Sequence, residues 1–246
     1  MRFVKPKVFL IGETRLLDEG LRDYLEHAGA PSWNTDAPSD SETVCEVMGR
    51  LCYRSFGAGL NPNVSKVREG NTPYLANIIQ VGHGSVLEHP TLNFIFADVS
   101  RVVTHELVRH RAGTAISQES LRFVRLETLS AYVPMHIEES DAGMAVFTRT
   151  FEQLEALQRE LAELYGIDDE ARFSEKKKLT SAFRRLAPIG LATTIGWSCN
   201  FRTLRHVIEM RTDPHAEEEI RFLFGEVFHQ VRDRYPNLFS DYEEEA

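Results

Sequence analysis

Cysteine and long hydrophobic runs are scarce in this chain, and their scarcity excludes several classes of protein. Among 246 residues only Cys45, Cys52 and Cys199 are cysteines, without a CxxC pair, which argues against a disulfide framework and a structural zinc. No apolar run approaches the roughly 18 residues that span a bilayer, and residues 1–10 lack the apolar core of a signal peptide. We therefore expect a cytoplasmic protein that does not enter membranes, with three buried, unreactive cysteines.

Positive charge is also in short supply. The chain has 28 Lys and Arg against 37 Asp and Glu, a formal net charge of -9, and residues 239–246 form an acidic tail. This balance gives no long-range attraction to nucleic acid. The chain has no GxGxxG after a predicted strand and no P-loop, so a bound nucleotide or flavin would not be held by either glycine-rich phosphate-binding device. Any Lys or Arg side chain that binds an anionic ligand must therefore do so by direct contact, without help from the net charge of the chain.

The hydrophobic pattern is mainly helical. Apolar residues at helical spacing predict helices over residues 41–53, 73–82, 142–165, 170–186 and 220–231, with Ser41 as the N-cap of the first. Alternation predicts a strand over residues 91–99, and Ser100 can cap a helix after it. Strands and helices do not alternate regularly, so we predict the α+β class. No boundary is sharp enough to divide residues 1–246 into two domains.

Strong hydrogen-bond donors are concentrated in Arg109-His110-Arg111 and, eleven residues on, Arg122. The predicted helix after Ser100 ends at the triplet, and hydroxyl and amide side chains lie between the triplet and Arg122. Guanidinium groups bind phosphate and planar ligands through several donors at once, so this run indicates a site for a phosphorylated planar ligand. His105 and His110 are five positions apart, about 140° around a helix, which does not suit a shared zinc ion.

Three further segments carry polar side chains that suit ligand binding. They are residues 82–89 in a glycine-bounded loop, Arg184-Arg185, and residues 200–215, which open a helix at Asn200. Taken singly, each has a simpler interpretation: a capped turn for the loop, a surface salt bridge for the arginine pair and a solvated helix face for the third segment. We expect a solvated helix face for Arg205. Arg202 and Arg211 lie roughly 180° apart around a helix, which hints at sites shared between subunits.

Five segments in this order resemble the flavin-dependent thymidylate synthases, the ThyX family. They are Cys52-Tyr53-Arg54-Ser55, Gly82-His83 through Glu88-His89, Thr104-His105-Glu106-Leu107-Val108-Arg109-His110-Arg111, Ser117-Gln118-Glu119-Ser120-Leu121-Arg122, and Asn200-Phe201-Arg202 leading to Arg211 and His215. The resemblance implies a single catalytic domain with a central antiparallel sheet, working as a homotetramer. It implies methylation of C5 of a uracil nucleotide, dUMP to dTMP, with methylenetetrahydrofolate as carbon donor, FAD as hydride carrier, NADPH as reductant and no metal.

The same resemblance assigns residues position by position. The nucleotide would be bound by Glu106, Arg109, Ser120, Leu121, Arg122, Arg184 and Arg211. The flavin would be bound by Ser55, His83, Ser85, Arg109, His110, Arg111, Gln118, Asn200, Arg202, His206 and His215. Arg211, His83 and Arg109 would be the catalytic residues. Arg211 would grip the uracil oxygens and stabilise negative charge on the ring.

One departure from the family pattern lies after the triplet. The family usually has seven residues between the triplet and the serine, whereas Ala112 to Glu119 here are eight, with the extra residue within 112–116. We expect Gly113-Thr114-Ala115 to form a flexible loop there. A reshaped nucleotide pocket leaves two enzymatic alternatives open, dUMP or another uridylate such as UMP in nucleoside-antibiotic synthesis. The third alternative is a flavin- or nucleotide-binding homologue without turnover.

Overall fold

The computed structural model describes residues 1–64, 66–124, 126–170 and 172–242. Its largest sheet is antiparallel, with the strands β2 (Lys7–Glu13), β3 (Thr91–Ser100), β6 (Ala192–Asn200) and β4 (Thr114–Gln118) adjacent in that order. A short parallel pair joins β1 (Arg2–Phe3) to β5 (Ser130–Ala131). Together with the many helices, this sheet confirms the predicted α+β class.

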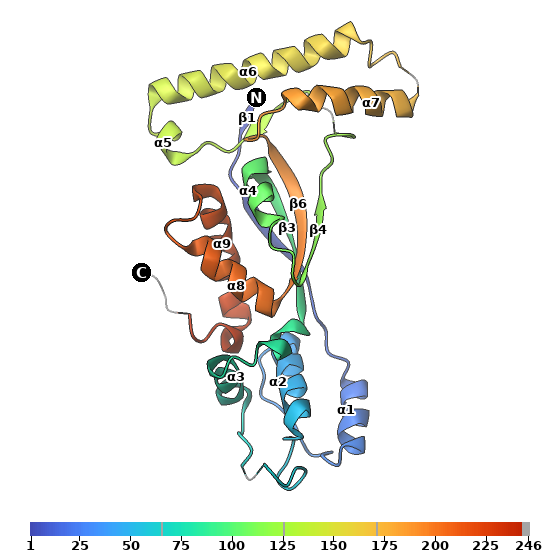
Figure 1. Cartoon of the computed structure of the whole chain (residues 1–246), viewed down its shortest axis with the longest axis vertical. Helices are drawn as coiled ribbons and strands as arrows, with labels where there is room; N and C mark the ends of the chain where they lie inside the picture. The colour runs from blue at the N-terminus through green and yellow to red at the C-terminus, as the bar shows by residue number, and fades with distance from the viewer. Residues whose placement is uncertain (65, 125, 171, 243–246) are drawn as a thin grey trace.

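Helices cover one face of the sheet and both of its ends (Figure 1). The core face meets α4 (Arg101–Leu107), α8 (Phe201–Thr212) and α9 (Glu218–Arg234). One end of the molecule holds α1 (Asp18–His27), α2 (Asp40–Tyr53) and α3 (Asn71–Gln80), and the other holds α5 (Met135–Glu138), α6 (Asp141–Leu164) and α7 (Phe173–Phe183). The short helices are η1 (Gly84–Glu88), η2 (Arg184–Leu186) and η3 (Pro236–Leu238). Within the described ranges, no helix is both long and apolar enough to span a membrane.

The main core lies between the sheet and α8 and α9. Alternate residues of β3, Leu92, Phe94 and Phe96, point into it as the sequence predicted, and Trp197 of β6 joins them at 1% exposure. Smaller clusters fill the two ends of the molecule. The second face of the sheet is different, because Phe9 and Ile11 of β2 lie on it 48% and 62% exposed. This face of the sheet therefore leaves apolar side chains exposed.

Several local predictions are wrong. The N-cap of α2 is Ser39 and not Ser41, because the Ser39 hydroxyl accepts from the Glu42 backbone N–H at 3.3 Å and donates to its carboxylate at 2.7 Å. Helix α3 begins at Asn71, two residues before Pro73. The sequence assigned no element to β6, which is nevertheless a central strand of the sheet. These errors leave the predicted order of helices intact.

Two predictions about exposed segments need correction. Thr114 and Ala115 belong to β4 and pair with Cys199 and Ser198, so the expected flexible loop is an ordered edge strand. Arg205 is not on a solvated face, because its guanidinium binds the Asp241 carboxylate at 2.6 Å and lies 4.7 Å from the Tyr242 ring. Of the acidic tail, residues 243–246 lie outside the described part of the chain. Its first residues thus pack against α8.

A buried carboxylate ties α9 to the start of α4. Glu219, 1% exposed, accepts hydrogen bonds from the backbone N–H of Ser100 at 2.6 Å and from its hydroxyl. The Ser100 hydroxyl also accepts from the backbone N–H groups of Val102 and Val103, and so caps α4 as predicted. Burial raises the pKa of Glu219 to about 7, against the hydrogen bonds from Ser100, which lower it. The folded protein therefore keeps a proton on this carboxyl above its ordinary pKa of 4.5.

This shift predicts a pH dependence of stability. Because the folded-state pKa of Glu219 is raised, its contribution is complete below about pH 4.5 and is lost as the pH rises through about 7. We expect the free energy of unfolding of the wild type to fall by about 3 kcal/mol relative to Glu219→Gln between about pH 4 and pH 8. Urea unfolding of both proteins at a series of pH values measures this difference. If the two free energies of unfolding changed in parallel with pH, the result would contradict this role of Glu219.

Candidate active site

An open cavity lies where α4 ends, β4 begins and α8 starts. Six of the residues that line it were predicted from the sequence to bind flavin: Arg109, His110, Arg111, Asn200, Arg202 and His206. The first three follow α4 directly, and the others occupy the first turns of α8. The structure therefore brings together two segments that lie far apart in the sequence.

Backbone contacts fix the relation between these segments. The Asn200 side chain caps α8 by accepting from the Thr203 backbone N–H at 2.9 Å, while its own backbone N–H donates to the Gly113 carbonyl at 3.1 Å. The Thr203 hydroxyl donates to the Ala112 carbonyl at 2.8 Å. Gly113 has a φ of +68°, a left-handed conformation that favours glycine. The segment with the extra residue is thus bound tightly to the start of α8.

The cavity is locally positive in an acidic chain. Arg109, Arg111 and Arg202 line it beside the N-terminus of α8, a helix of 12 residues. Glu88 is the carboxylate in the lining, and it pairs with Arg202 at 2.5 Å. Helix N-termini and guanidinium groups both favour anions, so this arrangement suits the phosphates of a nucleotide cofactor.

Arg211 lies next to this cavity in contact with Glu106 and His110. Its Nη1 is 2.5 Å from the Glu106 carboxylate, and its Nε donates to Nε2 of His110 at 2.9 Å. His110 also faces the ring of His206, with centroids 6.3 Å apart. Burial lowers the pKa of His110, and the positive charge of Arg211 and the nearby His206 ring lower it further. Predicted nucleotide and flavin residues are therefore in direct contact here.

The loop of residues 82–89 adjoins the same cavity. A Cβ on Gly84 would lie 3.1 Å from Nε of Arg202, so this glycine allows the loop to approach α8 closely. Ser85 is exposed beside it. His83 packs its ring against Tyr53 at 5.8 Å, and its buried Nδ1 has no hydrogen-bond partner among the described residues. An unpaired buried nitrogen is a group that a ligand could satisfy.

Comparison with known proteins identifies the family. Residues 35–237 match the family model described as Thymidylate synthase complementing protein. The flavin-dependent thymidylate synthase of Mycolicibacterium vanbaalenii is 36% identical over 222 residues, which cover 86% of this chain and 83% of that protein. The one from Mycobacterium tuberculosis is 35% identical over 224 residues, which cover 90% and 86%. The chain belongs to the flavin-dependent thymidylate synthase family. It is therefore an enzyme that works with a flavin, as the sequence predicted.

Solved structures of the thymidylate synthase fold agree with this assignment. Thymidylate synthase X from Helicobacter pylori, solved with FAD and dUMP, has a TM-score of 0.61 at 19% identity and covers 96% of this chain and 98% of its own. The UMP/dUMP methylase PolB from Streptomyces cacaoi, bound with 5-Br dUMP, has a TM-score of 0.67 at 15% identity and covers 98% of both chains. At these identities the likeness extends to the fold alone.

Not all predicted site residues lie at the cavity. Ser120, Arg122 and Arg184 lie beyond the other end of β4, which is about 14 Å long at the usual rise of a strand. Gln118, at that end, reaches Thr104 at 3.3 Å. The Leu121 side chain is 8% exposed in an apolar cluster, so its backbone is the part that could meet a ligand.

Two predicted flavin residues are held away from the cavity. Ser55 is 8% exposed, and its carbonyl accepts from Arg50 at 3.0 Å. His215 follows α8 with its side chain 95% exposed and bound to Asp213 at 2.9 Å. A ligand that touched these residues and the cavity at once would need either a long molecule or a second subunit.

Arg101 was not among the residues predicted from the sequence to bind a ligand. Its Nη2 donates to the Glu119 carbonyl at 3.3 Å, while its buried Nε has no hydrogen-bond partner among the described residues. Burial lowers the pKa of Arg101, and the nearby positive charge of Arg184 lowers it further. Arg101 meets the backbone of Glu119, which precedes Ser120 in the chain, and two neighbouring guanidinium groups there would suit a phosphate although the Glu119 carboxylate is also nearby. Nothing in the sequence signals this pairing, because Arg101 and Arg184 become neighbours only through the tertiary fold.

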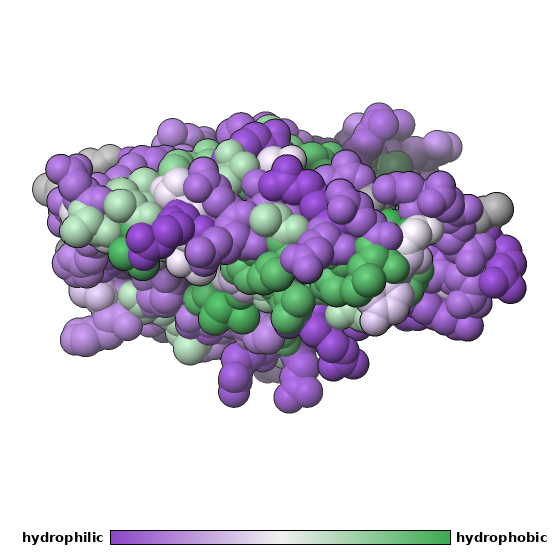
Figure 2. Space-filling model, turned by 90° about the horizontal axis from the view of Figure 1, so that it is seen from above, coloured by the Kyte–Doolittle hydropathy of each residue, from purple (hydrophilic) through white to green (hydrophobic). Residues whose placement is uncertain are grey.

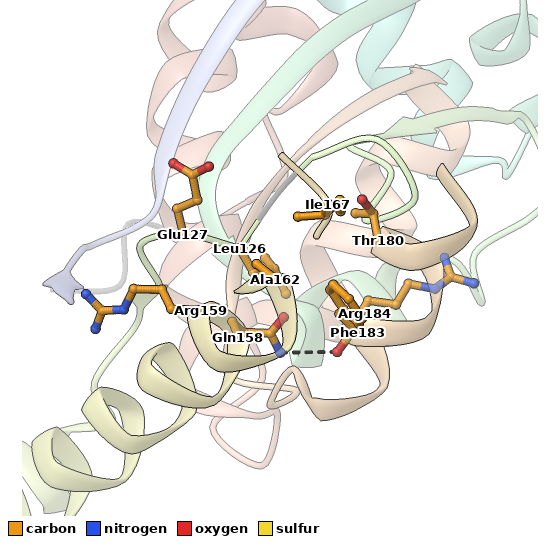
Figure 3. A pocket seen from close by; sticks show the side chains of 9 residues that line it. All are labelled: Leu126, Glu127, Gln158, Arg159, Ala162, Ile167, Thr180, Phe183 and Arg184. Carbon is orange, nitrogen blue, oxygen red and sulfur yellow. Dashed lines mark hydrogen bonds between the residues drawn. The ribbon is translucent and has the colours of Figure 1, made fainter. Parts of the chain in front are cut away.

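Arg184 also borders a small cavity between α6 and α7. Figure 3 shows apolar side chains facing the cavity, including Leu126, Ile167 and Phe183, and a hydrogen bond from Gln158 to the Phe183 carbonyl. The charged ends of Arg159 and Arg184 point to opposite sides. This cavity therefore does not bring the two arginines onto one ligand.

The cysteines differ in burial. Cys45 and Cys199 are fully buried, as predicted, and burial raises the pKa of both thiols, which makes them poor nucleophiles. Cys52 is exposed on α2, so the prediction that all three are buried is wrong for this residue. Over the described residues, no three His, Cys, Asp or Glu side chains gather closely enough to hold a metal ion.

Proposed function

We propose that this enzyme methylates C5 of dUMP to give dTMP, with methylenetetrahydrofolate as carbon donor and NADPH as the reductant of FAD. The observation that carries the proposal is the contact of Arg211 with Glu106 and His110 beside a cavity lined by three arginines. It places a group suited to a uracil ring next to groups suited to flavin phosphates. Bound FAD would supply the hydride, and the chain would bind, orient and stabilise charge.

The cavity residues fit a flavin nucleotide. Arg109, Arg111 and Arg202 would neutralise its phosphates at the start of α8, with Asn200, His110 and His206 as further polar contacts. The buried, unpaired Nδ1 of His83 would gain a hydrogen-bond partner from the same ligand. Ser85 lies close enough in the chain to join it. Ser55, Gln118 and His215 would act at the edge of the site or through a neighbouring subunit.

The nucleotide would bind through Arg211 and a distant set of residues. Arg211 would bind the uracil oxygens and stabilise the negative charge that develops on the ring, with Glu106 beside it. Ser120, Arg122 and Arg184, with Arg101, would bind the phosphate. Ser120 and Arg122 follow the end of β4 that is opposite the cavity. In this proposal the phosphate site of one chain would serve the ring site of another.

A homotetramer with shared sites would account for this separation. Phe9 and Ile11 leave one sheet face partly apolar and open. At the α6–α7 end, hydrophobic residues gather in a band among hydrophilic ones (Figure 2), and exposed Leu164, Phe173 and Ile189 belong to this end. Residues 1–246 would form a single catalytic domain in each subunit, and the assembly would work in the cytoplasm. The mass of the purified protein in solution tests the tetramer.

The assay for this function compares dUMP with UMP. The purified protein would be supplied with FAD, methylenetetrahydrofolate and NADPH, each omitted in turn, and the 5-methyl product would be detected by mass. We expect product from dUMP that needs all three small molecules. Product from UMP as well would favour the second alternative, a uridylate methylase, for which PolB is a structural relative. No product from either nucleotide would favour the binding homologue and contradict the proposal.

The mechanism would need no cysteine, and this gives a separate prediction. Replacing Cys45, Cys52 and Cys199 together by alanine or serine is expected to leave dTMP formation within about threefold of the wild type, because the two buried thiols are hard to ionise. Activity would be measured on protein checked for folding and flavin content. Loss of activity in a folded, flavin-loaded triple variant would contradict the cysteine-free mechanism.

A further inference from the structure

We propose that Arg211 holds His110 as a neutral imidazole with its proton on Nδ1, so that His110 serves the flavin as a hydrogen-bond donor and not as a cation. The inference rests on the proposed function for the identity of the ligand. The protonation state itself follows from the contacts of two side chains within this chain.

The geometry between the two side chains sets the position of the proton. Nε of Arg211 lies 2.9 Å from Nε2 of His110. A guanidinium group has five N–H donors and no acceptor, and it keeps its charge at all pH values of interest. Nε2 must therefore offer a lone pair to Arg211, and the proton of the neutral ring must be on Nδ1. A doubly protonated ring would point an N–H at the Arg211 N–H.

The surroundings of His110 support a neutral ring. Arg211 faces it from α8, and Arg109 and Arg111 flank it in its own segment, so positive charge dominates around the ring. The His206 ring lies beside it, with centroids 6.3 Å apart. Glu106 of α4 is the nearby carboxylate, and it is engaged by Arg211 at 2.5 Å. Burial lowers the pKa of His110, and the charge of Arg211 and the neighbouring His206 ring lower it further. Protonation of the ring would add a further cation to this group.

Arg211 can hold His110 and still bind a substrate. Its Nε is used by His110, one hydrogen of Nη1 by the Glu106 carboxylate, and Nη2 approaches the Glu106 carbonyl at 3.5 Å. One hydrogen on each Nη atom remains for the uracil oxygens. Within the described residues, no hydrogen bond is made by Nδ1 of His110, a residue that lines the cavity, so its N–H is free to donate to a ligand. Arg211 would therefore act as a positioning residue for the flavin as well as a catalytic residue.

Two substitutions of His110 separate its ring nitrogens. Asparagine places an amide nitrogen at the position of Nδ1, and glutamine places one near the position of Nε2, while neither carries a charge. We expect His110→Asn to bind FAD within about threefold of the wild type and His110→Gln to bind it about tenfold more weakly, the loss of one hydrogen bond. Equal losses in both variants, or a larger loss in His110→Asn, would overturn the proposal.

The proton can also be located directly. Nitrogen NMR of protein labelled in histidine, with the His110 signals assigned by their loss in His110→Asn, reports each ring nitrogen with and without FAD. The proposal expects an unprotonated Nε2 and a protonated Nδ1 at neutral pH. A protonated Nε2 would overturn it even if the enzyme makes dTMP. The expected tautomer in a protein that makes no dTMP would instead count against the proposed function alone.

Discussion

Arg211→Ala is expected to lower dTMP formation by at least about 1,000-fold while the protein still binds FAD. The variant loses a charge-assisted contact to the uracil, about 1.5 to 3 kcal/mol in binding, and the charge stabilisation that such a donor gives a transition state. It also leaves Glu106 without the partner that it has at 2.5 Å. Turnover with dUMP and FAD content by absorbance are the two measurements.

Flavin binding should survive this change because most cavity contacts remain. Arg109, Arg111 and Arg202 do not depend on Arg211, so we expect FAD affinity to stay within about tenfold of the wild type. Arg205→Ala is a matched control on the same helix, since Arg205 faces Asp241 and lies outside the cavity lining. Unchanged turnover in a folded, flavin-loaded Arg211→Ala protein would contradict the catalytic role of Arg211.

Gly113→Ala is expected to remove most FAD binding and activity. An alanine Cβ would lie 2.4 Å from the Asn200 amide nitrogen and 2.5 Å from the Thr203 hydroxyl, and the φ of +68° adds about 1 kcal/mol of strain. To relieve this overlap the Asn200 and Thr203 side chains must shift, which breaks the cap of α8 and the contact with Ala112. We expect this to loosen the start of the helix, where Arg202 lies. We expect a loss of FAD affinity of about 100-fold or more, since several contacts shift together. Equilibrium binding of FAD measures it.

A second glycine separates the backbone strain from the steric overlap. Gly59 also has a positive φ, +86°, but a Cβ there would meet nothing within 4 Å. Gly59→Ala should therefore show the stability cost of the backbone conformation while FAD affinity stays unchanged. Equal FAD binding by Gly113→Ala and the wild type would mean that residues 112–116 can rearrange without disturbing the flavin site. That result would contradict the role given to their contacts with α8.

Local sequence signals predicted the parts of the site that lie next to each other in the chain. The helix predicted after Ser100 placed Arg109 to Arg111 at the end of α4. Asn200 was predicted to open α8, and it caps that helix. The error at α2 was avoidable, because Ser39 and Glu42 have the spacing of a capping box. β6 also had a signal, since the buried residues Thr193, Ile195, Trp197 and Cys199 alternate with half-buried, mostly small residues.

Other features depend on contacts between distant segments and could not be read from the sequence. The hydrogen bonds of Gly113 and Ala112 to the start of α8 turn an expected flexible loop into the entry of β4. Arg205 belongs to a charged run that is typical of a solvated face, yet the chain end returns to cover it. The contact of Arg211 with His110 likewise joins α8 to the segment after α4.

The most direct test of the proposed function follows the flavin and the product in one reaction. FAD bound to the protein is reduced with NADPH in the absence of oxygen, and dUMP and methylenetetrahydrofolate are then added together. If the enzyme transfers hydride from its flavin to the nucleotide, flavin absorbance returns as dTMP forms, with one dTMP for each flavin reoxidised, and the triple cysteine variant does the same. This is the expected result. Formation of dTMP while the flavin stays reduced, or reoxidation without dTMP, would contradict it.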